Sequence, residues 1–475
     1  MLQKIGNTFP FLETAFAKIQ EIYLEIKTTL SDLFFVFCVA VCMLVVVPLL
    51  TVMTAFSIPG LALRGLHFAR IKQDRMVFYD NTPLDSEEYR NLSFTTAIRK
   101  AQSDFVGNDL AYLEMVREAN EYMISLDLDE LFAHEFFTVG NKEIHVVRSK
   151  EFDPMKKTII AFHGNVGSNF NFAGPMSLLA KDYNIILPEI KGYGVMSKSG
   201  SEAPKSGDIQ RYLGALAHEL FDKSRYNLDP SNTIVLGYSL GSKIASSFVR
   251  QAEFNCKVRF YNVVFLTTFI SVIKLSLEKF GLLGSRAHNL LVNFLLGIVE
   301  FIASFFISHV SDWSDSEAMN IKSPISVLHG LRDTTIPAHN AYALSTHLAK
   351  KRLHSSKDGS KANGVKIMLS AKDDHISILK MFLMDYHNVL CQPSKKESFE
   401  VGFYTDNVKG ERLYYPAVVR DNIFYVDGMS EESVANIERS LQDFDGSGIV
   451  NHNHEECSFI SSSAISNHVS NSLRI

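Results

Sequence analysis

Short apolar runs alternate with helix-like segments over residues 136–395, and this alternation limits the possible folds more than any other feature of the sequence. Strands that alternate with helices predict a mostly parallel sheet with helices on both faces. The segments "HEFFTV" and "KEIHVVR" indicate two strands near a turn at Gly140 and Asn141. Further strands are expected at 158–164, 184–190, 233–237, 262–268, 325–330 and 365–371.

The composition indicates a globular protein with a sizeable core. Its 475 residues are 46% hydrophobic and only 21% charged, which fits one large domain with extensions. The net charge is −5 and no long basic run occurs, so nucleic acid is not an expected partner. The five cysteines are scattered without CxxC spacing, which argues against a disulfide framework and a zinc site. We therefore expect no metal or cofactor. We also expect the functional part of the chain to face a reducing compartment.

Residues 33–58 carry no charge. About 20 apolar residues suffice to cross a hydrocarbon core, so this run predicts a transmembrane helix, with a buried core helix as the alternative. Basic residues are more frequent after the run than before it, which favours a cytosolic location for the chain that follows. The preceding segment, 1–32, is predicted to contain an amphipathic helix that lies on a membrane surface or packs on the main domain.

The stretch "VLGYSLGSKI" (235–244) places a glycine on each side of Ser239, directly after a β-branched run. A strand that turns at once into a helix, with a reactive side chain at the apex, needs residues without a Cβ on both sides. A side chain at Gly237 or Gly241 would collide with the tight turn. The pattern therefore predicts a nucleophile elbow in which Ser239 is the nucleophile.

A serine nucleophile needs a base and an acid that orients the base. In elbow enzymes both follow later strands, in the chain order nucleophile, acid, base. The segment "LHGLRDTTIP" supplies Asp333 just after a strand, and "MLSAKDDHISIL" supplies His375 after the last one. Asp373 and Asp374, just before the histidine, are interpreted as a solvated turn. The alternatives are Asp312 and Asp315 for the acid, and His354 and His387 for the base.

A developing oxyanion needs two fixed N–H groups. One is expected from the backbone of Leu240, directly after the nucleophile. The other is expected from Asn165 or its neighbour Val166, in the glycine-containing loop "FHGNVGSN" (162–169) that follows a strand. In the same loop, His163 is interpreted as a structural residue that positions the loop.

The chain from about 136 to 390 resembles the α/β-hydrolase superfamily. The resemblance rests on "HGN" after the third strand, "KGYG" (191–194) after the fourth, "GYSLGS" at the elbow and "HGLRDTTIP" near the acid. Within the superfamily the chain is similar to serine hydrolases of the BEM46 and ABHD types, which are often membrane-anchored and include depalmitoylases. It departs from them at Lys191, where an arginine is usual, in an insertion at 353–364, and at Asp374, where a small residue usually precedes the base.

The resemblance implies an α/β-hydrolase fold over 136–395, with a lid at 268–315. Within the lid, 290–310 is almost membrane-like but has a narrow polar stripe that includes Glu300. A lid helix is favoured because a charge at the centre of a membrane span is costly, with a second transmembrane span as the alternative. An apolar lid would shelter an acyl chain or dip into a bilayer, so the expected partners are a membrane and a lipid-like ester or thioester.

The remaining segments show no chemistry of their own. Residues 59–135 are predicted to form a helical connecting region, and 396–475 a C-terminal extension with a hairpin, a helix and a disordered tail. The segment 443–454 imitates a calcium loop, but His454 stands where a bidentate glutamate is needed, so calcium is not expected. The tail resembles translocation signals of Dot/Icm type IV secretion effectors, and the overall plan is similar to that of SidB-like effectors, which implies delivery to host membranes.

Two functional hypotheses follow from the sequence. In the first, the chain is a membrane-anchored serine hydrolase that cleaves an acyl ester or thioester through an acyl-enzyme. In the second, it is an inactive hydrolase fold that serves as a membrane interaction module. A third hypothesis is a peptidase of the same fold, but the sequence shows neither a charged specificity pocket nor a propeller domain.

Overall fold

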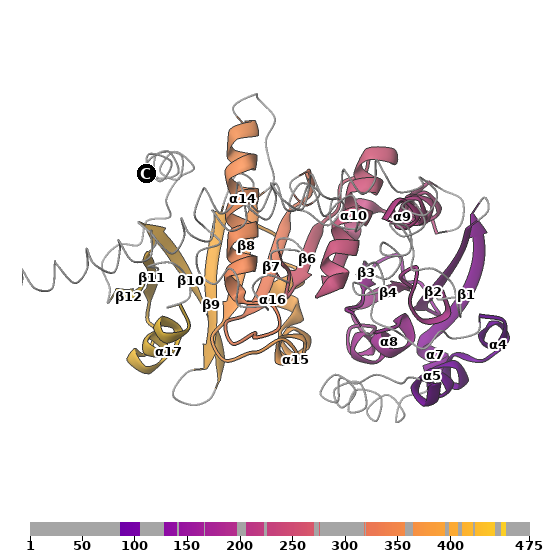
Figure 1. The fold of residues 1–475 in the computed structure, drawn as a ribbon, viewed down its shortest axis with the longest axis horizontal. Coiled ribbons are helices and arrows are strands. Elements are labelled where there is room, and N and C mark those ends of the chain that lie inside the picture. Colours follow the sequence, from indigo (N-terminus) through magenta and orange to yellow (C-terminus); the bar gives the residue numbers. More distant parts are fainter. Residues whose placement is uncertain are drawn as a thin grey trace, which may run out of the picture. The chain divides into compact units, whose positions relative to one another are not determined.

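Figure 1 shows the computed structural model of the chain. All described residues belong to the second of the two units into which the chain divides, Arg70–Ile475. No helix among them is long and apolar enough to span a membrane. The predicted segments 1–32, 33–58 and 290–310 lie outside them, so these predictions are not tested. The described residues are 86–104, 128–139, 142–165, 167–196, 206–222, 226–269, 275, 318, 320–356, 364–394, 399–406, 411–420, 423–441 and 448–452.

The described strands form one sheet in the order β1-β2-β4-β3-β5-β6-β7-β8-β9-β10-β11-β12. Strands β3 to β9 pair in parallel, as do β11 and β12, whereas β1, β2 and β10 pair antiparallel to their neighbours. This confirms the predicted mostly parallel sheet. The strands are β1 Phe132–Val139, β2 Lys142–Ser149, β3 Lys157–Phe162, β4 Tyr183–Pro188, β5 Thr233–Tyr238, β6 Asn262–Leu266, β7 Ile325–Gly330, β8 Val365–Ser370, β9 Phe399–Asp406, β10 Arg412–Arg420, β11 Ile423–Asp427 and β12 Gly448–His452.

Helices cover both faces of the sheet. The helices are α4 Ser86–Arg90, α5 Phe94–Asp104, α7 Leu128–Leu131, α8 Asn169–Ser177, α9 Ser206–Phe221, α10 Leu240–Asn255, α14 Ala338–Ser356, α15 Ser377–Met384, α16 Tyr386–Leu390 and α17 Glu431–Leu441, with short 3₁₀ turns at η1 Gly194–Met196 and η2 Pro230–Asn232. One core contains the apolar residues of α9, α10, α14 and α17, and the other contains those of α5, α8, α15 and α16. Consecutive residues of β3 alternate between the two cores, as expected for a strand buried on both faces.

The sheet does not end at β8, the last strand within the hydrolase resemblance. Strand β9 pairs with β8 from Val365↔Phe399 to Ser370↔Tyr404, and β10 to β12 continue the same sheet. In Figure 1 these four strands lie at one end of the sheet and β1 and β2 at the other. Residues 448–452, within the calcium-like segment 443–454, form β12.

Candidate active site

Ser239 lies at the sharp junction between β5 and α10. Its backbone has φ 54° and ψ −121°, a conformation with positive φ that residues other than glycine rarely adopt. Such a conformation costs on the order of 1–3 kcal/mol and is concentrated at functional sites. The Ser239 N–H donates to the carbonyl of Leu266 on β6 at 2.9 Å, which fixes the apex against the neighbouring strand.

The two glycines beside the serine allow two different close approaches. A Cβ on Gly237 would lie 2.4 Å from the Gly241 carbonyl oxygen and 2.5 Å from the Cα of Ser242, so Gly237 is required by the tight turn, as predicted. A Cβ on Gly241 would instead lie 2.2 Å from the Phe162 carbonyl oxygen. Gly241 therefore lets α10 pack against the end of β3, which differs from the role that the sequence suggested.

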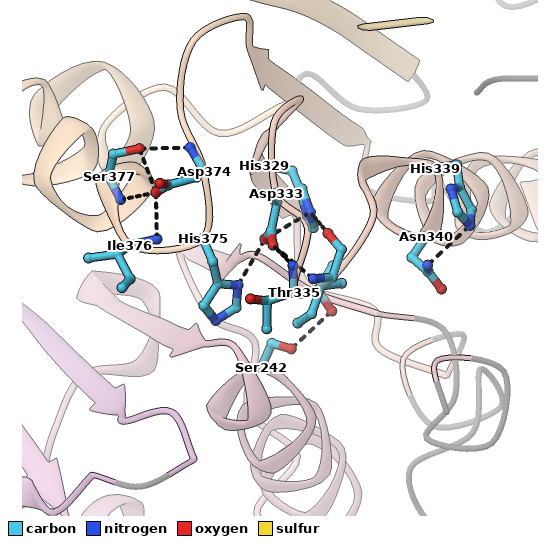
Figure 2. Close-up of polar contacts among 12 residues, drawn as sticks. Ser242, His329, Asp333, Thr335, His339, Asn340, Asp374, His375, Ile376 and Ser377 are labelled. Carbon is cyan, nitrogen blue, oxygen red and sulfur yellow. Dashed lines mark hydrogen bonds and ion pairs between the residues drawn. The ribbon is translucent and has the colours of Figure 1, made fainter. Parts of the chain in front are cut away.

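Asp333 and His375 meet where β7 and β8 end. The His375 Nδ1 donates to Asp333 Oδ2 at 2.8 Å, and Figure 2 shows this bond beside the first turn of the helix that carries Ser242. Asp333 is only 4% exposed, and its Oδ1 accepts the backbone N–H groups of Thr335 and Ile336, both at 2.8 Å. These two bonds fix the Asp333 carboxylate in an orientation that leaves Oδ2 to accept the hydrogen bond from His375.

The pKa of Asp333 reflects this environment. Burial works to raise the pKa, but the hydrogen bond and charge of His375, the charge of His329 and the backbone N–H of Ile336 outweigh burial and lower the pKa below its ordinary value. The buried His329 lies 3.5 Å from Asp333 Oδ2 and donates from Nε2 to the Ile336 carbonyl at 2.8 Å. Asp333 is therefore an anion, as needed to stabilise a protonated base.

Tyr238 connects the serine to the histidine. Its hydroxyl donates to the backbone carbonyl of His375 at 3.0 Å, and the two rings lie 5.4 Å apart between centroids. Tyr238 directly precedes Ser239, so Ser239 and His375 lie at the same edge of the sheet. Among the described residues the Ser239 hydroxyl has no hydrogen-bond partner. Catalytic hydrogen bonds are often loose before substrate binds, so the missing bond does not exclude Ser239 as the nucleophile.

Two of the three predicted oxyanion donors, Leu240 and Asn165, lie on described segments near the serine. Leu240 is the first residue of α10, where backbone N–H groups have no partner within the helix. The loop with Asn165 passes close to the elbow, because a Cβ on Gly164 would lie 3.3 Å from the Cβ of Ser239. The Asn165 side chain accepts a hydrogen bond from the Tyr193 hydroxyl at 2.5 Å. Val166 lies outside the described residues.

Glu189 is a structural partner of this loop that the sequence reasoning missed. It is fully buried at the end of β4, and His163 Nε2 bonds to its Oε1 at 2.8 Å. The other ring nitrogen of His163 donates to the Gly164 carbonyl at 2.8 Å. Glu189 also accepts the backbone N–H groups of Asn169 and Ile190. This network agrees with the structural role predicted for His163, and an acid at the end of a buried strand was the signal for Glu189 in the sequence.

Of the two aspartates before His375, Asp374 is solvated as the sequence suggested, whereas Asp373 is not. Asp373 is only 5% exposed and bonds to the Ser370 hydroxyl and to Arg412. Asp374 is exposed, and its Oδ1 accepts the N–H groups of Ile376 and Ser377 at the start of α15, away from Asp333 (Figure 2). The departure from the usual small residue at 374 therefore leaves the Asp333–His375 bond intact.

Of the alternative bases, His354 belongs to α14. His387 lies exposed on α16. Asp312 and Asp315 lie outside the described residues. The described part of the chain contains no group of His, Cys, Asp and Glu that could hold a metal ion.

Comparison with known proteins gives structural similarity only. No protein-family model matches the chain, and no curated protein matches it. One similar solved structure is a membrane phospholipase A, a bacterial virulence factor, which is 15% identical over 59% of this chain and 92% of that chain, with a TM-score of 0.38. Others are esterase Pf2001 of Pyrococcus furiosus (17% identical, 55% and 88% covered, TM-score 0.36) and carboxylesterase CesB of Bacillus subtilis (16% identical, 59% and 98% covered, TM-score 0.36). The chemistry proposed below rests on the site itself.

Proposed function

We propose that the chain is a membrane-associated α/β-hydrolase that cleaves an acyl ester or thioester through a serine acyl-enzyme. The observation that carries the proposal is the Asp333–His375 bond at the edge of the sheet where Ser239 holds a strained elbow conformation. A buried carboxylate, an imidazole bound to it and a serine at a strand-to-helix turn are the parts that acyl transfer needs.

The reaction follows from these positions. His375 takes the proton of Ser239 while the hydroxyl oxygen attacks the acyl carbonyl carbon, and Asp333 stabilises the imidazolium that forms. The N–H groups of Leu240 and of the Asn165 loop stabilise the oxyanion. His375 then protonates the departing alcohol or thiol. Water, activated by the same imidazole, attacks the acyl-enzyme and releases the acid.

The lipid-like substrate and the membrane are proposed from the sequence. The uncharged segment 33–58 supports membrane anchoring, and the basic residues after it support a cytosolic location of the catalytic domain. The apolar insertion at 268–315 supports an acyl chain rather than a polar substrate.

Labelling with a fluorophosphonate probe tests the proposal. The purified chain should be labelled, and Ser239→Ala should abolish labelling. The control is Ser246→Ala, since Ser246 lies on the same helix and its hydroxyl donates to the Ser242 carbonyl within α10. A folded wild-type chain that is not labelled and hydrolyses no acyl ester would contradict the proposal and favour the inactive interaction module.

A further inference from the structure

The loop that carries His375 is attached to the C-terminal extension by one backbone hydrogen bond and two ion pairs. It joins β8 to α15, and its first residue, Ala371, donates a backbone hydrogen bond to the Tyr404 carbonyl on β9 at 2.9 Å. Farther along, Asp373 Oδ2 accepts a hydrogen bond from Arg412 Nη1 on β10 at 2.9 Å. The β9–β10 hairpin therefore holds the loop just before the catalytic base.

Arg412 belongs to a row of alternating charges, Asp373–Arg412–Asp406–Lys372. Its Nε lies 3.1 Å from Asp406 Oδ1 at the end of β9, and Lys372 Nζ, on the loop, lies 3.2 Å from Asp406 Oδ2. Partial burial works to raise the pKa of Asp406, but the hydrogen bonds of Arg412 and Lys372 outweigh burial and lower it. Two ion pairs thus cross from the loop to the hairpin, Asp373–Arg412 and Lys372–Asp406. Arg412 forms the first and also bonds to Asp406, the acid of the second.

Asp373 in turn fixes the loop to the strand that carries the acid. Its backbone carbonyl accepts the N–H of Arg332 at 3.1 Å, directly before Asp333. The approach is close enough that a Cβ on Gly330 would lie 2.2 Å from the Asp373 carbonyl oxygen. The Ser370 hydroxyl donates to the same carboxylate oxygen as Arg412. Asp373 therefore sets the spacing between the Asp333 loop and the His375 loop.

We propose that Arg412 is a positioning residue for His375, and that the β9–β10 hairpin is part of the catalytic machinery. This inference rests on the proposed function. An exposed ion pair alone contributes little, but Asp373 is buried, and removing its cation leaves a buried carboxylate without a counterion. The unpaired carboxylate should then turn toward solvent and displace the loop that carries His375. A displacement of about 1 Å at a catalytic site can lower the rate by about 100-fold.

The test compares Arg412→Met, which keeps the length of the side chain but removes its charge, with Arg412→Lys. The control is Arg439→Met, an equal charge change on α17 of the same extension, where Arg439 Nε donates to the Ala435 carbonyl of its own helix. With p-nitrophenyl butyrate, Arg412→Met should lower kcat by about 10-fold to 100-fold with little change in KM. Arg412→Lys should recover part of the loss, and Arg439→Met should behave like the wild type.

A double variant shows whether the effect passes through Asp373. Asp373→Asn combined with Arg412→Met should have nearly the kcat of the slower single variant, because both remove one interaction. The proposal is overturned if Arg412→Met keeps the wild-type kcat, if only KM changes, or if Arg439→Met is equally slow. If Arg412→Met does not fold, the same comparison is made with Asp373→Asn and Arg412→Lys.

Hydrogen exchange separates this inference from the proposed function. If the wild type shows no turnover that Ser239→Ala abolishes, the proposed function fails. In that case amide exchange of 371–378 in Arg412→Met still reports on the loop. Faster exchange there than in Arg439→Met supports the attachment of the loop to the hairpin, and unchanged exchange contradicts it.

Discussion

Replacing Gly241 by alanine would place a methyl group against the end of β3. The new Cβ would lie 2.2 Å from the Phe162 carbonyl oxygen and 2.4 Å from that of His163. Both oxygens are backbone atoms, so they cannot rotate away as the end of a flexible side chain would. To bring the first contact from 2.2 Å to 3.0 Å, the closest that real Cβ atoms approach, α10 and β3 must separate by about 0.8 Å, the difference between the two distances.

The expected cost follows from this overlap. Overpacking in a well-packed interior typically costs about 1–3 kcal/mol, and two backbone clashes place Gly241→Ala near the upper limit. The matched control is Gly214→Ala on α9, where the new Cβ would lie 3.7 Å from its nearest neighbour, an ordinary contact. Alanine is favoured over glycine inside a helix by roughly 0.5–1 kcal/mol, so this variant should be as stable as the wild type or more stable.

Urea unfolding followed by circular dichroism measures both effects. Gly241→Ala should lower the free energy of unfolding by about 3 kcal/mol, and its fluorophosphonate labelling should slow by up to about 100-fold, because the shift moves the Asn165 loop relative to the elbow. If Gly241→Ala were as stable as the wild type, or if Gly214→Ala lost as much stability, the packing of α10 on β3 would be wrongly described.

Three further substitutions test the site and its surroundings. Asp333→Asn should lower kcat by roughly 10⁴-fold, measured with p-nitrophenyl butyrate, and an unchanged kcat would exclude this residue as the acid. Tyr238→Phe removes the hydroxyl that donates to the His375 carbonyl, and should lower the free energy of unfolding by about 1 kcal/mol in urea titrations; no loss would mean that this bond contributes nothing. Burial, with the charge of His134, holds the pKa of His145 well below 6.5 in the folded chain. Since the unfolded chain takes up this proton near pH 6.5, stability should fall as the pH drops below that value, by up to about 1.4 kcal/mol per unit for this group. Urea titrations at pH 7.5 and 5.5 should therefore show a smaller loss for His145→Gln than for the wild type, and an equal loss would contradict the assignment.

The sequence predicted the strands of the central sheet well because each is one contiguous apolar run. The runs at 158–164 and 184–190 correspond to β3 Lys157–Phe162 and β4 Tyr183–Pro188, with differences of a few residues at their ends. The order of the strands could not be predicted in the same way. β4 lies between β2 and β3, and nothing local in a buried strand states which neighbour it will pair with.

The candidate triad was accessible to sequence reasoning because each member follows a recognisable strand. Glu189 also follows a predicted strand, but it was missed, like Arg412, because the role of each depends on a distant partner. Glu189 lies 26 residues after His163, and Arg412 lies 39 residues after Asp373. A single acid or a single arginine forms no repeating pattern in the sequence, so nothing near it indicates which distant residue it will bond to.

The interpretation of Asp373 as solvated was wrong because it depended on the boundary drawn at 395. An aspartate in a loop is expected to be exposed unless a cation or several donors accompany it into the interior. The cation, Arg412, belongs to the segment that the sequence assigned to a separate extension. In the structure every residue of β8 pairs with β9. Without the segment after 395, β8 would be an exposed edge strand and Asp373 would lack the guanidinium of Arg412. The same hairpin therefore extends the sheet beyond β8 and pairs a cation with the carboxylate two residues before His375, and the domain that carries the candidate site extends at least through β10.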